Sequence, residues 1–195
     1  MIDLIKSRIQ QSVDLKSSLL KDTDLLQKIE KITALIVASY QHKGKVLWCG
    51  NGGSAADSQH LAAELSGRFY YDRAPLFSEA LHVNTSYTTA VANDYSYDVI
   101  YSRLVEAMGN KGDVLIGLST SGNSGNVVKA FEKARAMGIT TVGFTGESGG
   151  KMKALSDYLI NIPSTDTPRI QECHMLLGHT ICELVESSLF PKSQS

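Results

Sequence analysis

Residues 45–65, KVLWCGNGGSAADSQHLAAEL, decide the fold. After its first residue, the run Lys45–Cys49 is apolar without alternation, which is typical of a strand buried on both faces of a sheet. A glycine-rich turn at residues 50–53 follows it and leads into a helix expected over Ala55–Leu65. A strand, a glycine turn and a helix in this order begin a parallel β-α-β unit.

The same order of elements recurs downstream. The further strands are expected at Ala80–Asn84, Asp113–Leu118, Thr140–Phe144 and Tyr158–Ile162. Two of them lead through STSGNSGN and TGESGG into helices expected over Val127–Met137 and Lys151–Leu155. Repeated units of this kind predict a three-layer α/β/α sandwich with a parallel sheet, which binds ligands at the carboxyl ends of its strands.

Helices are expected at both ends of the chain. Apolar residues at helical spacing predict two amphipathic helices within residues 1–43, separated near Lys21–Thr23. These helices either cover the domain's own sheet or pack against a partner subunit. Thr167 is expected to cap a final helix that has Pro168 in its first position, ends near Leu189 and precedes a frayed tail. Residues 44–190 would then hold the α/β core and last helix of a single domain spanning 1–195.

Composition excludes several classes of protein. The 195 residues, 43% of them hydrophobic, suit one core rather than two. Nineteen Lys and Arg against twenty Asp and Glu give a net charge of -1, with no basic block that would bind nucleic acid. No apolar run resembles a signal peptide or a membrane span, so a cytoplasmic protein without a membrane or nucleic-acid partner is expected. Cys49, Cys173 and Cys182 are expected to be reduced core thiols.

Residues 118–126, LSTSGNSGN, have the composition of a phosphate-binding loop. The hydroxyl side chains are Ser119, Thr120, Ser121 and Ser124. Free backbone amides and the partial positive charge of the following helix favour an anion here. A simple capped turn would need one hydroxyl, so four hydroxyls with two interleaved glycines favour phosphate.

The first turn, GNGGSA at residues 50–55, also fits the dinucleotide-binding pattern G-x-G-x-x-A. That pattern expects an acidic residue at the end of the second strand to hold a ribose. The segment expected to be that strand ends in Val83 and Asn84 instead. A second loop rich in hydroxyls therefore favours a sugar phosphate over a dinucleotide.

Two helices carry candidate metal ligands. His60 and Glu64 are four residues apart on one helix face and could share a divalent metal, with zinc favoured by the nitrogen ligand. A plain surface contact is the commoner origin of such a pair, but this helix starts at the glycine loop on the ligand side of the sheet. On the last helix, Gln171 and His179 are separated by roughly 12 Å along the axis. Sharing one metal would require a distorted first turn or ligands from different subunits, and His174 is assigned to packing.

Four segments together resemble the bacterial phosphoheptose isomerases, also called sedoheptulose 7-phosphate isomerases, of the sugar isomerase domain superfamily. These segments are CGNGGSAADSQHLAAELSGR, VANDYSYDVIYSR, LSTSGNSGNVVKA and PRIQECHMLLGHTICELVE. The resemblance covers nearly the whole chain. It implies a five-stranded parallel sheet flanked by helices, and a homotetramer with active sites between subunits.

The resemblance also implies roles for individual residues. Glu64 and His179 would be the catalytic pair. The implied zinc ligands are His60, Glu64, Gln171 and His179. The implied substrate contacts are Asn51, Gly52, Gly53, Glu64, Asn93, Asp94, Ser119, Thr120, Ser121, Ser124 and Gln171.

The chain departs from the family pattern just after GNGGS. Family members often carry His-Cys-Asp there and a second Glu before the catalytic one, where this chain has Ala55-Ala56-Asp57 and Ala63. In these positions it also resembles a paralogue that binds the bacterial replication initiator and lacks the catalytic Glu and His.

Both catalytic residues are present here, which favours an enzyme. The expected reaction converts sedoheptulose 7-phosphate into D-glycero-D-manno-heptose 7-phosphate through a cis-enediol, as the first step towards ADP- or GDP-heptose. Two alternatives stay open: a non-catalytic protein that binds the initiator, and an isomerase of another sugar phosphate.

Overall fold

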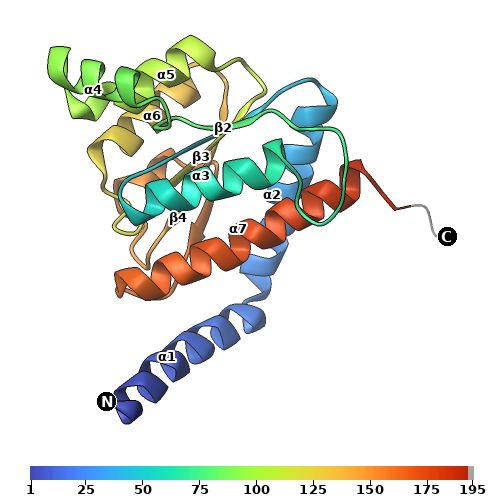
Figure 1. The fold of residues 1–195 in the computed structure, drawn as a ribbon, viewed down its shortest axis with the longest axis vertical. Coiled ribbons are helices and arrows are strands. Elements are labelled where there is room, and N and C mark those ends of the chain that lie inside the picture. The colour runs from blue at the N-terminus through green and yellow to red at the C-terminus, as the bar shows by residue number, and fades with distance from the viewer. Residues whose placement is uncertain (193–195) are drawn as a thin grey trace.

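The computed structural model describes residues 1–192, and the last part of the expected tail, 193–195, lies outside them. Five parallel strands form one sheet in the order β2-β1-β3-β4-β5, with helices on both faces (Figure 1). The strands are β1 (Val46–Gly50), β2 (Ser78–Ala80), β3 (Val114–Ser119), β4 (Thr140–Thr145) and β5 (Tyr158–Asn161). The predicted three-layer sandwich with a five-stranded parallel sheet is therefore confirmed.

The described residues also form seven α-helices. They are α1 (Ile2–Lys21), α2 (Thr23–Gln41), α3 (Gly53–Ser66), α4 (Thr85–Asp94), α5 (Ile100–Met108), α6 (Gly125–Ala136) and α7 (Thr167–Leu189). Two short 3-10 helices, η1 (Tyr97–Val99) and η2 (Gly150–Leu155), complete the order. The predicted break between the first two helices lies at Asp22, whose carboxylate accepts a hydrogen bond from the Leu25 amide at 2.9 Å. In the described part of the chain, each helix is too short or too polar to cross a membrane.

Each face of the sheet has its own hydrophobic core, because successive strand residues point to opposite faces. Trp48 faces the core built with α2, α3 and α7, whereas Leu47 faces the core built with α5 and α6. Both side chains are fully buried. The three cysteines are buried free thiols, as predicted.

Five elements differ from the sequence prediction. The second strand ends at Ala80, because Asn84 caps α4 by accepting a hydrogen bond from the Tyr87 amide at 3.0 Å. Helices α4 and α5 were not predicted. Only Val91 of α4 is buried, so α4 shows little helical periodicity, whereas α5 buries Ile100, Tyr101 and Val105 at helical spacing, a signal that the sequence prediction did not use. The segment that starts at Gly150 is a 3-10 helix, and the N-cap of α7 is Asp166, one residue earlier than expected.

Strand pairing places the two glycine-rich loops beside each other. β1 and β3 are neighbours in register from Val46 opposite Val114 to Gly50 opposite Leu118. Their carboxyl ends therefore lie at the same edge of the sheet, and the loops at residues 50–53 and 119–124 leave that edge together. This edge is where ligands are expected in an open parallel sheet.

Candidate active site

The loop at residues 119–124 gathers hydroxyl groups before α6. The Ser119 hydroxyl lies 2.8 Å from that of Ser124 and 3.5 Å from that of Ser121. Gly122 has a φ of 67°, and a Cβ there would collide with the Gly149 carbonyl oxygen, so only glycine fits. Three of the four predicted hydroxyls thus meet, while Thr120 lines an adjoining cavity of about 560 Å³.

The first glycine loop is equally constrained. Gly52 has a φ of 56° and ends the loop, so that α3 begins at Gly53. At Gly53 the Gln171 side chain of α7 lies so close that a Cβ would come within 2.7 Å of its Nε2 atom. The same Nε2 lies 3.4 Å from the hydroxyl of Ser54. Gln171 of α7 therefore contacts the first turn of α3, beside the predicted substrate contacts Gly52 and Gly53.

Near the other end of α3, three ionisable side chains meet. His60 Nε2 lies 3.0 Å from Glu64 Oε1, and the His60 and His179 rings are edge to face with centroids 4.9 Å apart. One ligand atom from each residue lies within 4.8 Å of the others. The α3 pair of the sequence analysis is therefore more than a surface contact, because α7 brings His179 against it.

The His179 environment favours its neutral form. Partial burial lowers the pKa of its imidazole below the ordinary value, the nearby His60 adds to this, and the Glu64 carboxylate opposes it. A neutral imidazole can accept a proton or bind a metal. Two imidazole nitrogens and one carboxylate form a donor set that suits zinc, and donors bound to one tetrahedral zinc lie about 3.4 Å apart. Side-chain rotations would have to bring these three atoms together to that spacing.

The structure does not bring Gln171 to this cluster within one chain. Gln171 contacts Ser54, which precedes His60 by six residues, or roughly 9 Å along a helix. On α7, between Gln171 and His179, His174 is buried. Its Nε2 lies 3.1 Å from the Thr145 carbonyl oxygen, as expected for a packing residue. Burial lowers the pKa of His174 to about 4.

Asn93 and Asp94 lie at the end of α4, on the face of the sheet opposite α7. Both are exposed, and the Asn93 amide donates to the Asp94 carboxylate at 2.9 Å. Three residues after Asp94, the Tyr97 hydroxyl donates to Asn51 Oδ1 at 3.1 Å. This segment therefore borders the first glycine loop rather than the cluster of His60, Glu64 and His179.

The sequence analysis missed two residues at this edge, Tyr97 and Asn126, which both bond to Asn51. A signal for Asn126 existed, since Asn51 and Asn126 are amide residues that follow neighbouring strands. Tyr97 lies within VANDYSYDVIYSR, one of the segments that carry the family resemblance, but no element was predicted there and no role was assigned to it.

Comparison with known proteins identifies the family of this chain. Residues 11–146 match the family described as the SIS domain. The phosphoheptose isomerase of Aneurinibacillus thermoaerophilus is 51% identical over 190 residues, covering 97% of this chain and 96% of that protein. The phosphoheptose isomerase of Clostridium acetobutylicum is 50% identical, covering 97% of each. The solved structure of a phosphoheptose isomerase from Neisseria gonorrhoeae superposes with a TM-score of 0.89 at 39% identity, covering 95% of this chain and 98% of the other.

The parallel sheet with its two glycine-rich loops and the matched family define a SIS domain protein. Identity near 50% over almost the full length of both proteins narrows the assignment. The chain belongs to the phosphoheptose isomerases of the SIS domain family.

Proposed function

We propose that this chain is an enzyme that isomerises sedoheptulose 7-phosphate to D-glycero-D-manno-heptose 7-phosphate, the first step in making a nucleotide-activated heptose. The proposal rests on one observation: a chain that is similar to phosphoheptose isomerases has both a loop lined by hydroxyl groups and a carboxylate beside two imidazoles. The loop would anchor a phosphate, and the carboxylate and imidazoles would move protons.

The phosphate end of the substrate would bind the loop at residues 119–124. Ser119, Ser121 and Ser124 already gather their hydroxyls there, and Thr120 lies between them in the chain. Gly52, Gly53 and Gln171 line the adjoining turn, and Asn51, Asn93 and Asp94 border it. Binding energy spent on the phosphate fixes the reacting carbons in place.

Glu64 is our candidate for the catalytic base. Moving a carbonyl from C2 to C1 requires removing a proton from one carbon, forming a cis-enediol and returning a proton to the neighbouring carbon. A carboxylate above the plane can do both transfers. His179, held in its neutral form by burial, would carry protons on the substrate oxygens.

The donor set also supports a zinc site, with His60, Glu64 and His179 as ligands and Gln171 as the fourth if a second subunit supplies it. Bound zinc would polarise the substrate carbonyl. To test this, a chelated protein should lose activity and regain it with added zinc. Full activity without metal would remove zinc from the proposal.

The separation of the two ends of α3 supports active sites shared between subunits. Glu64 follows Gly53 by eleven residues, roughly 16 Å along the helix. A heptose phosphate has about eight bonds from C1 to phosphorus, and at roughly 1.2 Å per bond it spans roughly 10 Å. One substrate would therefore reach the loop of one chain and the Glu64 of another. We propose a homotetramer with such sites.

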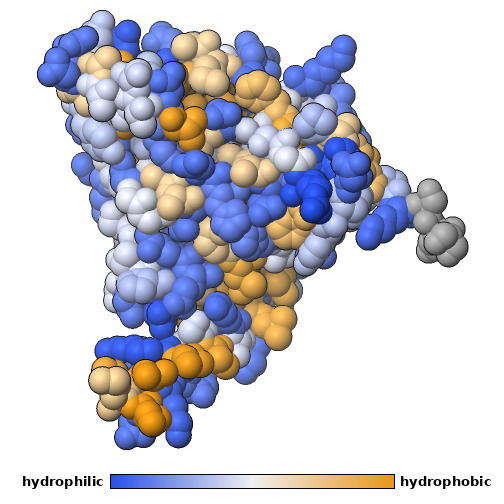
Figure 2. Space-filling model, in the orientation of Figure 1, coloured by the Kyte–Doolittle hydropathy of each residue, from blue (hydrophilic) through white to orange (hydrophobic). Residues whose placement is uncertain are grey.

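The surface of α1 supports self-association. The helix extends away from the sheet (Figure 1), and Figure 2 shows apolar residues concentrated on it. Ile5 and Ile9 are 52% and 60% exposed.

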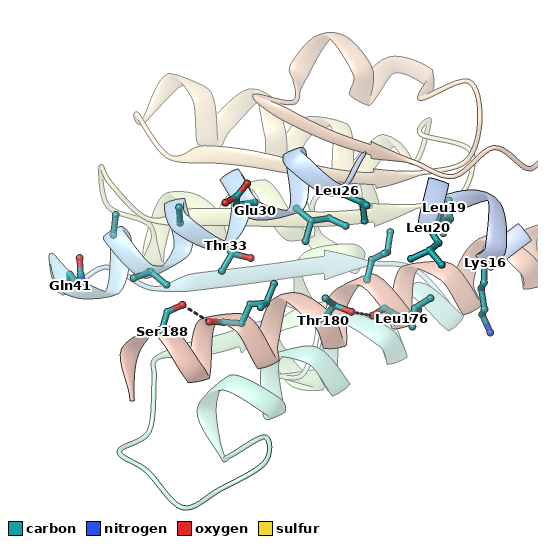
Figure 3. A pocket seen from close by; sticks show the side chains of 16 residues that line it. Lys16, Leu19, Leu20, Leu26, Glu30, Thr33, Gln41, Leu176, Thr180 and Ser188 are labelled. Atoms are coloured by element: carbon teal, nitrogen blue, oxygen red, sulfur yellow. Dashed lines mark hydrogen bonds between the residues drawn. The ribbon is translucent and has the colours of Figure 1, made fainter. Parts of the chain in front are cut away.

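Beside α1, an apolar groove of about 670 Å³ runs between α2 and α7. Figure 3 shows that side chains of both helices, such as Leu26 and Leu176, line it. Apolar surface of this extent is typical of an interface. Light scattering should give the mass of four chains, and Ile5→Asp with Ile9→Asp should lower it.

The decisive experiment compares ketose phosphates of five, six and seven carbons as substrates, with detection of the aldose product by NMR. We expect the seven-carbon substrate to have the highest kcat/KM. A preference for a six-carbon substrate would change the assigned sugar. The absence of aldose from all three would favour a non-catalytic binding protein.

A further inference from the structure

The two glycine-rich loops are joined by a reciprocal pair of amides. Asn51 Nδ2 donates to Asn126 Oδ1 at 2.8 Å, and Asn126 Nδ2 donates to Asn51 Oδ1 at 2.9 Å. Asn51 lies in the loop after β1, and Asn126 lies in the first turn of α6, directly after the hydroxyl loop. These two bonds therefore fix the spacing of the loops at the edge where we place the substrate.

Asn126 can hold only one orientation in this pair. Its Oδ1 also accepts the Val127 backbone N–H at 2.9 Å, and an N–H group can only donate. The oxygen must therefore face Val127, which leaves Nδ2 to donate to Asn51. Asn126 is 2% exposed, so water does not compete for these atoms.

The orientation of the Asn126 amide determines that of the Asn51 amide. Its Oδ1 accepts from Asn126 and also from the Tyr97 hydroxyl at 3.1 Å, which uses both lone pairs of the oxygen. One N–H of the Asn51 amide is left to face a ligand. If Asn126 were absent, the Asn51 amide could rotate and present its oxygen, which would repel an anion.

The hydroxyl loop is fixed independently on its other side. Asn123 Oδ1 accepts the Lys151 backbone N–H at 3.0 Å, and Asn123 Nδ2 donates to the Ser121 carbonyl at 2.9 Å. The loop at residues 50–53 is linked to neighbouring elements through the Asn126 pair, which holds the Asn51 amide. Its other links are the Tyr97 bond to Asn51, the Tyr101 hydroxyl bond to the Gly50 carbonyl and the Gln171 contact at Gly53. A change at Asn126 should therefore act mainly on the first loop, through Asn51.

We propose that Asn126, supported by Tyr97, is a positioning residue that orients Asn51 and sets the spacing between the two loops, so that a phosphate group meets donors from both. This inference rests on the proposed function for its substrate. Asn126 and Tyr97 both lie outside the substrate, zinc and catalytic sets predicted from the sequence, whereas Asn51, the residue they orient, belongs to the substrate set.

The first experiment measures binding of inorganic phosphate by calorimetry and the kinetics with sedoheptulose 7-phosphate. Asn126→Ala should weaken phosphate binding roughly tenfold and raise KM by a similar factor, while kcat changes less than about threefold. Tyr97 is 52% exposed, so Tyr97→Phe should fold normally. It should show a smaller effect of roughly twofold to threefold. Unchanged phosphate affinity and KM in both variants would overturn the proposal.

Tyr95→Phe is the matched control. Tyr95 is 63% exposed and lies two residues from Tyr97, and its ring stacks on the Arg103 guanidinium. Its phosphate affinity and kinetics should equal those of the unchanged protein. If Tyr95→Phe weakened phosphate binding as much as Tyr97→Phe, the effect would be a general one of this segment, and the role of Tyr97 would be overturned.

A double-mutant cycle separates positioning from a general structural effect. If Asn126 acts through Asn51, the pair Asn51→Ala with Asn126→Ala should raise KM no more than Asn51→Ala alone. Additive effects would overturn the proposal, whatever the melting temperatures of the variants. Failure of the proposed function looks different: the unchanged protein would bind phosphate in a way that depends on Asn126, yet produce no aldose.

Discussion

The two ends of α3 are built in opposite ways. In its first turn and the loop before it, Asn51, Gly53 and Ser54 contact side chains of other elements, which restricts their movement. Toward its last turn, Glu64 and His60 contact each other and the ring of His179, and the His60 side chain is 53% exposed. A group that anchors a phosphate benefits from rigidity, whereas groups that exchange protons or bind a metal must ionise and adjust.

The backbone at the reactive end is nevertheless fixed. Arg73 donates to the Glu64 carbonyl at 2.9 Å and to the Leu65 carbonyl at 2.8 Å. Its guanidinium is paired with Glu186 of α7 at 3.1 Å, and the two side chains are 2% and 1% exposed. Breaking such a buried pair from one side costs several kcal/mol. The helix end is therefore rigid, while the side chains that it carries are not.

The largest effect should come from the reactive end. Glu64→Gln keeps the shape of the side chain but removes the base, so kcat should fall roughly a thousandfold. Phosphate affinity should not change, because the loops lie at the other end of α3. Glu183→Gln, an exposed change on α7, is the control and should leave both values unaltered. Near-normal turnover by Glu64→Gln would exclude Glu64 as the base.

The second prediction tests whether the phosphate loop and the Glu64 that act on one substrate belong to different chains. Glu64→Gln and the double variant Ser119→Ala with Ser124→Ala should each be nearly inactive at low substrate concentration. Co-expressed in one cell, they should regain about a quarter of normal activity, because that share of randomly assembled shared sites has both halves intact. Mixtures no more active than the mean of the two variants would place a complete site in each chain.

A smaller effect is expected at the anchoring end. Ser119→Ala removes one hydroxyl of the phosphate loop, so KM should rise roughly tenfold and kcat should change little. This is the reverse of the Glu64→Gln result. Steady-state kinetics of the two variants side by side would contradict the division of labour if Ser119→Ala lowered kcat alone.

The smallest effect concerns stability and comes from His174, the buried histidine of α7. Burial lowers the pKa of His174 to about 4 in the folded chain, while an unfolded histidine has a pKa of about 6.5. Below pH 6.5 the unfolded state binds the extra proton, so stability is lost as pH falls from about 6.5 towards 4. By pH 5 the loss should be about 2 kcal/mol.

The measurement for this prediction is Tm as a function of pH. His174→Gln can keep a donor for the Thr145 carbonyl without titrating, so its Tm should fall less than that of the unchanged protein between pH 7 and pH 5. Parallel curves would show that His174 does not govern acid stability. Activity of the variant at pH 7 should stay close to normal, because His174 faces the core.

Much of the fold could be predicted because its signals are local. The apolar run before GNGGS and those before STSGNSGN and TGESGG each lie in a strand, and the gap at Asp22 separates two helices. The segment from Thr85 to Asp94 could not be predicted in the same way. There α4 has Val91 as its one buried residue, so its hydrophobic periodicity is weak. Helix α5 did carry a local signal, because its buried residues Ile100, Tyr101 and Val105 recur at helical spacing, but the prediction did not use it.

By itself, the sequence determined the layers of the fold, the positions of the two loops and the residue types available for chemistry. It did so because strand and helix periodicity and turn-forming glycines act over a few residues. Only the tertiary structure decided which side chains meet. Asn51 bonds to Asn126 across 75 positions, and His179 reaches His60 from a different helix. Such pairs depend on the packing of whole elements, which no local pattern records.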